Sequence, residues 1–366
     1  MSGVPDSPAD PTSSERFVFV DALRGIAATG VMLCHLLMAS PLLERFGRFG
    51  PNVVGIGARG VQIFFVISGF VIAHSLRATP LTGREAGRFI LRRQARLDPP
   101  YWVMLLIAMA VWRLHNRIHG THALPVTWGD FVVNAAYLQR ILQRPDLLHV
   151  GWTLCIEIQF YLAFIVLLRL GTRTGETNAA GPSRAVVAMV FLTALAALPL
   201  DPNLTHMARW AGPAWPYFAA GALCYWAVRR QAPVWPLAVL SAGMIAAGVW
   251  IGDKDQSPAF AGVVTVGAIY LVGRARRLGT LWGNRPVQYL GRISYSIYLT
   301  HIPITVNLLH VGERFVGRRQ MTSVCCLVAT SVAGIGVAHA YYLAVERPSM
   351  RLAKRMKSRT PVAVMA

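Results

Sequence analysis

The chain has few charged residues, and acidic ones are the scarcest among them. Only 14% of its 366 residues are charged, and 36 Lys and Arg stand against 16 Asp and Glu. Hydrophobic residues make up 54% of the chain, and the mean hydropathy is +0.45. Such a composition excludes an ordinary soluble globular domain and is typical of an integral membrane protein.

Several other features are sparse or missing. The sequence has no internal repeat, no phosphate-cradling glycine loop, no cluster with metal-ligand spacing and no linker long enough to separate a second domain. The five cysteines all fall in apolar runs, where reduced buried thiols are the expectation; they are Cys34, Cys155, Cys224, Cys325 and Cys326. We therefore expect one helical unit without a disulfide framework and without a metal.

The apolar runs have the length that a membrane helix needs. A helix crosses about 30 Å of hydrocarbon with roughly 17 to 25 residues. The sequence predicts an all-α polytopic bundle of about ten transmembrane helices, at approximately 17–40, 58–76, 98–115, 150–170, 184–200, 209–228, 234–251, 259–273, 289–310 and 321–345. Residues 127–142 are half apolar, which leaves a re-entrant or interfacial helix open as well as a crossing.

The cations are distributed unevenly along the chain. Of the 36 Lys and Arg, 20 fall on the N-terminal side of the ten predicted spans and nine on the opposite side. This asymmetry predicts cytoplasmic termini and argues against nucleic-acid binding as the reason for the net charge of +20. We expect a disordered cytoplasmic tail at 1–16, a membrane domain at 17–350, and a basic cytoplasmic tail at 351–366 that lies on anionic lipid.

The first apolar run contains two ionisable residues. Arg24 and His35 are eleven positions apart, which places them on one face of a helix and separates them by roughly 16 Å. Charged groups inside a spanning helix are costly and usually face a bundle interior or a wet cavity. The alternative is an interfacial arginine that reaches the lipid headgroups and a histidine bonded to a nearby carbonyl.

Five local patterns occur in order along the chain. They are Phe19 to Ala28 running on to His35, Arg59 to Phe70 (Arg-Gly-Val-Gln-Ile-Phe-Phe-Val-Ile-Ser-Gly-Phe), Arg92 to Trp102, Trp152 to Glu157 followed by Phe160 and Tyr161, and Leu290 to His301 with a closing Tyr342 and Glu346-Arg-Pro348. Each pattern joins polar residues to an apolar helix, and their combination is far more specific than any one of them.

With these patterns the chain resembles the acyltransferase 3 family of multi-spanning bacterial membrane O-acyltransferases, over about residues 17–350. The resemblance implies transfer of an acyl group, commonly acetyl, from cytoplasmic acyl-CoA to a hydroxyl of a surface sugar, a lipid-linked saccharide or a macrolide. It maps the family's arginine and histidine onto Arg24 and His35, its arginine-rich stretch onto Arg92, Arg93 and Arg96, and its Trp and Glu onto Trp152 and Glu157. Ala22 stands where relatives often have glycine.

The residues support the same chemistry independently of the resemblance. Acyl transfer to an alcohol removes the hydroxyl proton as the new bond forms, and imidazole suits that task near neutral pH. His35 is the candidate base, although an acyl-histidine intermediate is also open. Glu157, near the middle of its span, is expected to orient the imidazole. The alternative for Glu157 is a buried ion pair with an intramembrane arginine.

The anionic acyl-CoA needs cations on the cytoplasmic side. Arg92, Arg93 and Arg96 precede Pro99-Pro100, which we expect to be the rigid start of the third helix. Guanidinium groups bind phosphate through paired planar hydrogen bonds, so these three are the candidate donor-binding residues. Arg24 is a further candidate contact for the phosphates or the pantetheine arm. Positive-inside topology alone accounts for the preceding arginines, Arg77, Arg84 and Arg88.

The acceptor side is less defined by the sequence. Trp152, Tyr295 and His301 are the candidate acceptor-binding residues, although Tyr295 and His301 serve equally well in a hydrogen bond that closes the bundle. Ser68 favours close helix packing, and His149 is expected in a loop without a role. A secondary transporter is the alternative of another class, but the chain lacks the two related halves with interrupted helices that are typical of one. Location in the bacterial inner membrane follows from the resemblance.

Overall fold

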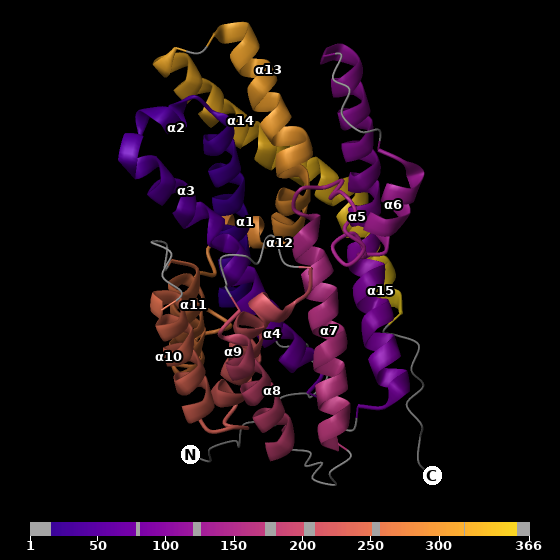
Figure 1. The fold of residues 1–366 in the computed structure, drawn as a ribbon, viewed down its shortest axis with the longest axis vertical. Helices are drawn as coiled ribbons and strands as arrows, with labels where there is room; N and C mark the ends of the chain where they lie inside the picture. Colours follow the sequence, from indigo (N-terminus) through magenta and orange to yellow (C-terminus); the bar gives the residue numbers. More distant parts are fainter. Residues whose placement is uncertain are drawn as a thin grey trace, which may run out of the picture.

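A computed structural model describes residues 16–77, 81–119, 126–172, 181–200, 209–250, 257–317 and 319–356. The structure is 82% helix, and no strand occurs among these residues. Figure 1 shows the helices packed side by side, most of them along one long axis. The all-α architecture predicted from the sequence is therefore confirmed.

The helices follow the predicted apolar runs closely. Their order is α1 (Val18–Ala39), α2 (Leu42–Arg45), α3 (Gly50–Ala58), α4 (Gly60–Ser75), α5 (Gly83–His119), α6 (Trp128–Ala135), α7 (Gly151–Thr172), α8 (Arg184–Ala197), α9 (Trp215–Val228), α10 (Trp235–Trp250), α11 (Ser257–Arg274), α12 (Arg285–Thr300), α13 (Asn307–Val316), α14 (Gln320–Tyr341) and α15 (Arg347–Arg355). Each predicted run lies on one of these helices or on two consecutive ones.

Four helical stretches within the described residues are long and apolar enough to cross a membrane. They are Val18–Ala39, Val54–Ser75, Gly151–Gly171 and Gln320–Arg355. Three shorter apolar helices accompany them, at Arg184–Ala197, Trp235–Trp250 and Pro258–Arg274. The protein is thus built for several membrane crossings, and the full number of ten stays a prediction.

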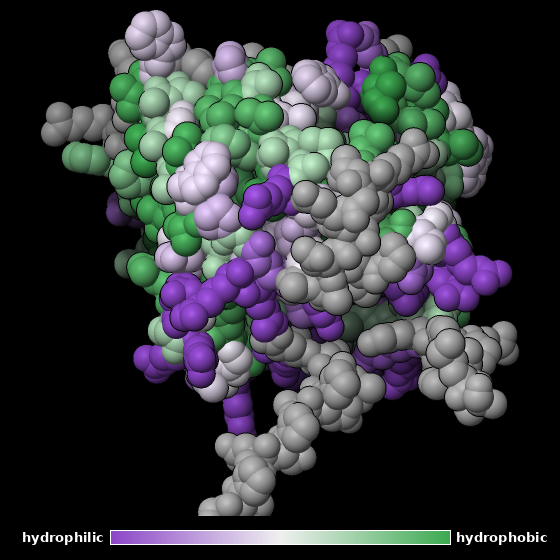
Figure 2. Space-filling model, turned by 90° about the horizontal axis from the view of Figure 1, so that it is seen from below, coloured by the Kyte–Doolittle hydropathy of each residue, from purple (hydrophilic) through white to green (hydrophobic). Residues whose placement is uncertain are grey.

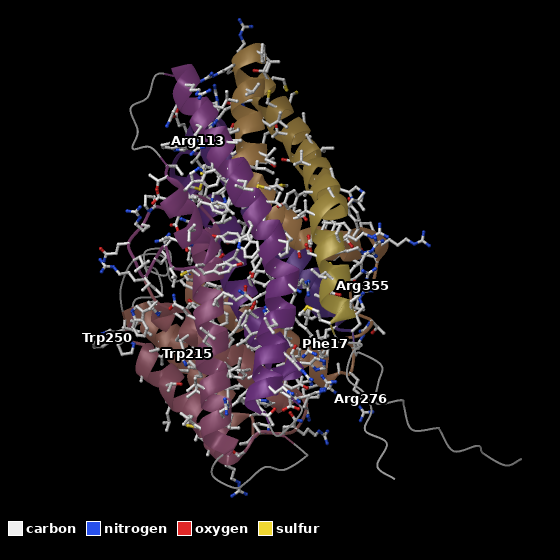
Figure 3. The ribbon with its side chains drawn as sticks, turned by 90° about the vertical axis from the view of Figure 1, so that its right-hand side faces the viewer. Phe17, Arg113, Trp215, Trp250, Arg276 and Arg355 are labelled. Atoms are coloured by element: carbon white, nitrogen blue, oxygen red, sulfur yellow. The ribbon has the colours of Figure 1, made fainter. Side chains whose placement is uncertain are left out.

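The start of the third predicted span was wrong. Helix α5 runs unbroken over 37 residues and passes through Pro99 and Pro100. It begins earlier because Thr82 and Glu85 bond each other's backbone N–H, at 2.9 and 3.2 Å, which caps the first turn. The hydroxyl of Tyr341 donates to the carbonyl of Pro100 inside the bundle. Figure 3 shows α5 along most of the length of the molecule. The arginines from Arg84 to Arg96 are therefore part of a helix and not of a loop.

Glycines bring two pairs of helices into backbone contact. A Cβ on Gly25 of α1 would lie 2.5 Å from the backbone nitrogen of Gly291 on α12. A Cβ on Gly69 of α4 would lie 1.9 Å from the carbonyl oxygen of Phe218 on α9. Without a hydrophobic driving force between helices in lipid, such small-residue contacts are a main source of close packing. They fix α1 against α12 and α4 against α9.

Two segments depart from regular α-helix in the same part of the bundle. Residues His301–Val306 and Tyr342–Glu346 are π-helical. The first contains Pro303, which has no N–H to give to the regular ladder. Single π turns are rare and occur frequently at functional sites. His301 begins the first segment and Glu346 ends the second, and both side chains are at most 1% exposed.

The half-apolar stretch after α5 does not form a long helix. Helix α6 has eight residues and is capped by Thr127 and Asp130, and turns follow it. Eight residues rise only about 12 Å, which is too short for a crossing. Ion pairs hold the turns, with Arg144 at 2.8 Å from Asp130 and Arg140 paired with Asp146. The sequence left open a crossing helix or a re-entrant or interfacial one. The structure shows a short helix followed by an ordered loop, and no crossing helix in this stretch.

The chain ends are only partly described. Arg16 contacts Asp21 at 3.1 Å and Gln288 at 2.9 Å, and the rest of the predicted tail 1–16 lies outside the described residues. At the other end α15 continues to Arg355, and residues 357–366 lie outside. Figure 3 places Phe17 and Arg276 toward one end of the molecule and Arg113 toward the other. Figure 2 views the molecule from the Phe17 end; hydrophilic side chains gather on part of this face, and hydrophobic ones cover much of the rest.

Candidate active site

A small cavity lies between α1, α4, α5, α7 and α12. Its volume is about 60 Å³, which holds a few water molecules. Charged and hydroxyl side chains share its wall with apolar ones; the lining residues are Arg24, Val61, Phe64, Phe65, Ser68, Arg93, Leu97, Thr153, Leu154, Glu157, Ser294, Tyr295 and Tyr298. All five sequence patterns therefore meet at one place.

An ion pair forms part of the wall of this cavity. Arg93 Nη2 lies 2.8 Å from Glu157 Oε1, and each side chain is 17% exposed. The same oxygen accepts hydrogen bonds from Ser68 Oγ, at 2.6 Å, and from the hydroxyl of Tyr161. The guanidinium of Arg93 also lies over the Tyr161 ring, 4.0 Å from its centroid. The alternative interpretation of Glu157, a buried pair with an intramembrane arginine, is the contact that the structure contains.

Two further arginines surround this pair. Arg96 interacts electrostatically with Arg24 and Glu346, and Arg93 interacts with both Arg24 and Arg96. The carboxylate of Glu346 accepts a hydrogen bond of 2.6 Å from Ser296. The buried Nε atoms of Arg93 and Arg96 have no hydrogen-bond partner in the described part of the chain. Three guanidinium groups and two carboxylates thus form one largely half-buried cluster with an excess of positive charge.

The three candidate donor-binding arginines are placed differently on α5. Arg93 lines the cavity, and Arg96 faces Arg24 and Glu346. Arg92 is half-buried on the same helix and is not among the lining residues described above. Successive residues on a helix point about 100° apart, and only Arg93 of these two neighbours reaches the cavity wall.

His35 belongs to a second group, made of histidines. Its ring centroid lies 5.0 Å from that of His301 and 6.2 Å from that of His149. Its Nδ1 lies 2.9 Å from the carbonyl oxygen of Val31, one turn earlier on α1. His301 is fully buried, whereas His149 is exposed in the loop before α7. No metal-binding group of three or more His, Cys, Asp or Glu was found among the described residues, these histidines included.

Tyr298 joins the cavity to the histidine group. It lines the cavity, shares a hydrogen bond of 2.8 Å with Thr153, and has its ring centroid 5.7 Å from that of His301. Arg24 and His35, on one helix, therefore belong to two adjoining polar regions. The candidate centre is elongated, with arginines at one end and histidines at the other.

The remaining predicted site residues pack around the cavity. The Tyr295 hydroxyl donates to the carbonyl of Leu97 at 2.9 Å, and its side chain lines the cavity. This is the bundle-closing bond considered for Tyr295. Trp152 is 9% exposed, and its ring lies edge-on to Phe65 with centroids 6.3 Å apart.

Three residues of this region were missed by the sequence analysis. Ser68 was expected only to permit packing, yet it donates to Glu157. Glu346 was noted in a closing pattern without a role, although an acidic residue followed by Arg-Pro within an apolar region is unusual enough to single it out. His149 was assigned to a loop, and its position directly before the helix of Trp152 and Glu157 was the available signal.

Comparison with known proteins identifies the family of this chain. A family model described as an acyltransferase domain, that of the acyltransferase 3 family, matches residues 17–340. The chain belongs to this family, and it is a multi-pass membrane acyltransferase. No solved structure matched the chain.

Named relatives cover different shares of the chain. Acyltransferase MdmB of Streptomyces mycarofaciens is 26% identical, over 96% of each chain. Nodulation protein 10 of Rhizobium leguminosarum is 23% identical, over 96% of this chain and 98% of its own length. Peptidoglycan O-acetyltransferase OatA of Listeria monocytogenes is 25% identical over 78% of this chain, which matches 49% of that relative's length.

Proposed function

We propose that this acyltransferase moves an acyl group, most simply acetyl, from cytoplasmic acyl-CoA to a hydroxyl group of a carbohydrate acceptor. The observation that carries the proposal is the elongated polar centre along α1, with the arginine cluster at Arg24 and the histidine group at His35. One end suits an anionic donor, and the other end suits removal of a proton from an alcohol.

The arginine cluster supports the donor assignment. Acyl-CoA carries several phosphate charges. When all groups of the cluster are ionised, its three arginines carry one more positive charge than its two glutamates carry negative charge. The Nε atoms of Arg93 and Arg96 without a partner leave donor groups available to an anionic ligand. Arg92 does not line the cavity. Its positive charge would attract the anionic donor toward the entrance.

The histidine group supports the chemistry. The carbonyl of Val31 can only accept, so Nδ1 of His35 carries the hydrogen and Nε2 is the basic nitrogen of the neutral ring. As His35 takes the hydroxyl proton, the acceptor oxygen bonds to the acyl carbon and the C–S bond breaks. In the two-step alternative, Nε2 itself takes the acyl group first and the alcohol displaces it. In both versions Glu157 acts through Arg93, which it holds in place.

The acceptor assignment rests on the other end of the centre. Tyr295 lines the cavity, Trp152 packs on Phe65 of its wall, and His301 belongs to the histidine group. Together they offer aromatic surfaces with polar edges, which suit a sugar. OatA, a relative, is named as a peptidoglycan O-acetyltransferase, which favours a saccharide hydroxyl here. The ordered loop around α6, which carries His149, lies next to this end and would border the acceptor.

The charge asymmetry supports the orientation of the reaction. The side of the predicted spans with more Lys and Arg is the end near Phe17 and Arg276. By the positive-inside rule, this end and both chain termini would face the cytoplasm. The bundle would then sit in the bacterial inner membrane with about ten crossings and receive acyl-CoA from the arginine side.

The test uses the full chain in lipid nanodiscs with radiolabelled acetyl-CoA and separate acceptors: soluble peptidoglycan fragments, a lipid-linked sugar and a macrolide. Label transfer to a saccharide is the expected result. Transfer to the macrolide alone would overturn the carbohydrate assignment and keep the donor. Failure of acetyl-CoA to bind by calorimetry, with no transfer to any acceptor, would overturn the donor assignment.

A further inference from the structure

His301 carries a buried nitrogen that no other group satisfies. Its side chain is 0% exposed and begins the first π-helical segment. Its Nδ1 lies 2.8 Å from the carbonyl oxygen of Tyr298, and its Nε2 has no hydrogen-bond partner in the described residues. A buried polar atom left unpaired costs free energy, so such atoms call for a specific explanation.

The backbone contacts fix which nitrogen of each ring is basic. In His35 and in His301 alike, Nδ1 faces a carbonyl oxygen of its own helix, that of Val31 and that of Tyr298. A carbonyl only accepts, so each Nδ1 carries a hydrogen and each neutral ring has its lone pair on Nε2. Two imidazoles from different helices, with centroids 5.0 Å apart, thus each offer a free acceptor nitrogen.

We propose that His301 is a second proton acceptor of the transfer reaction and that it shares with His35 the proton that leaves the acceptor hydroxyl. This inference rests on the acyl-CoA-dependent transfer proposed above. The O–H bond breaks, the oxygen bonds to the acyl carbon, and the C–S bond breaks to release the CoA thiolate. The proton passes to the histidine pair and leaves through the exposed ring of His149, while the thiolate takes a proton from water.

The surroundings of the pair limit it to one proton. The charged side chains with the largest electrostatic effect on His301 are His35 and His149, and neither is an acid that would stabilise a second positive charge. Two imidazolium rings in contact inside a membrane protein repel strongly. The pair therefore works as one unit, and removal of either ring should abolish the function of both.

The experiment measures CoA release from acetyl-CoA by the full chain in nanodiscs, with soluble peptidoglycan fragments as the acceptor probe. His301→Gln should lower kcat by about 100-fold or more and leave the KM for acetyl-CoA unchanged. The double variant His35→Gln with His301→Gln should be no slower than the slower single variant. Added imidazole should restore part of the rate of His301→Ala, which a role in packing alone would not produce.

His339→Gln is the matched control. His339 is a half-buried histidine on α14, its ring packs on Tyr289 with centroids 5.6 Å apart, and its Nδ1 likewise lacks a partner among the described residues. This variant should keep wild-type kcat. A folded His301→Gln that retains more than about one-tenth of kcat, or single losses that multiply in the double variant, would assign His301 to packing. Wild-type protein that binds no acetyl-CoA by calorimetry and releases no CoA with the peptidoglycan fragments, the lipid-linked sugar or the macrolide would instead overturn the donor proposal, and this inference with it.

Discussion

Arg93 on α5 and Glu157 on α7 form a half-buried ion pair of 2.8 Å, and its carboxylate oxygen also accepts hydrogen bonds from the hydroxyls of Ser68 and Tyr161. Removing one charge of such a pair leaves the other unpaired in a medium that solvates it poorly. The pair therefore holds three helices together at the wall of the cavity, and a substitution there affects folding as well as binding.

The ion pair predicts different outcomes for single and double substitutions. Arg93→Ala alone should destabilise the protein by about 1 to 3 kcal/mol, because it leaves the half-buried Glu157 carboxylate without its charged partner. Arg93→Gln combined with Glu157→Gln removes both charges and should recover much of that loss. Thermal unfolding in detergent, monitored by tryptophan fluorescence, measures both. Equal destabilisation by the two variants would contradict the pairing.

The arginine cluster predicts a loss of donor affinity. Arg96→Ala should raise the KM for acyl-CoA by roughly 10 to 150-fold with kcat mostly preserved, because a charge-assisted hydrogen bond contributes about 1.5 to 3 kcal/mol. Arg92→Ala should have a smaller effect, since Arg92 does not line the cavity. Arg88→Ala, exposed on the same helix, is the control. Calorimetric titration with acetyl-CoA gives the affinities, and unchanged values in every variant would assign these arginines to topology alone.

His35 predicts a loss in the chemical step. His35→Ala should lower kcat by about 10² to 10⁴-fold, the usual contribution of a general base, without loss of expression. Acetyl-CoA affinity should stay near that of the wild type because the arginine cluster is intact. Exchange of labelled CoA into acetyl-CoA without an acceptor would further show whether the acyl group rests on the enzyme. A variant with more than about one-tenth of wild-type kcat would exclude His35 as an essential base.

The glycine contacts predict a steric effect. Gly25→Ala should destabilise the protein by about 1 to 3 kcal/mol, since its new Cβ would lie 2.5 Å from Gly291 nitrogen. Gly267→Ala on α11 is the matched control, because nothing lies within 4 Å of its Cβ position. Thermal midpoints of the two variants in one detergent compare them. A stable Gly25→Ala protein would mean that α1 and α12 separate easily.

The orientation is tested with reporter fusions at positions just after helices. Fusions after Arg77 and after Met356 should report cytoplasm, and one after Gly317 should report the opposite side, because cations concentrate near the first two. A cytoplasmic signal after Gly317 would break the proposed assignment of the donor and acceptor sides.

Apolar runs were enough to predict where most helices lie, since each run must be buried in lipid or protein. They failed at α5, where the proline pair suggested a beginning and the capping contact of Thr82 with Glu85 set an earlier one. The ion pair between Glu157 and an arginine was predicted only as an alternative. The approach of His301 to His35 was not foreseen at all, because it depends on how closely α12 packs on α1 through Gly25 and Gly291.

That backbone contact between α1 and α12 has a consequence for how acceptor preference diverges in the family. Helix α1 carries Arg24 and His35, and α12 with its π-helical continuation carries Ser296 and His301. Where α1 and α12 cross, their backbones touch and no layer of side chains separates them. Such a frame tolerates little adjustment, so new acceptors are accommodated more readily by exchange of the 126–150 segment around α6. Grafting that segment from a relative with another acceptor should therefore transfer preference while donor use is retained.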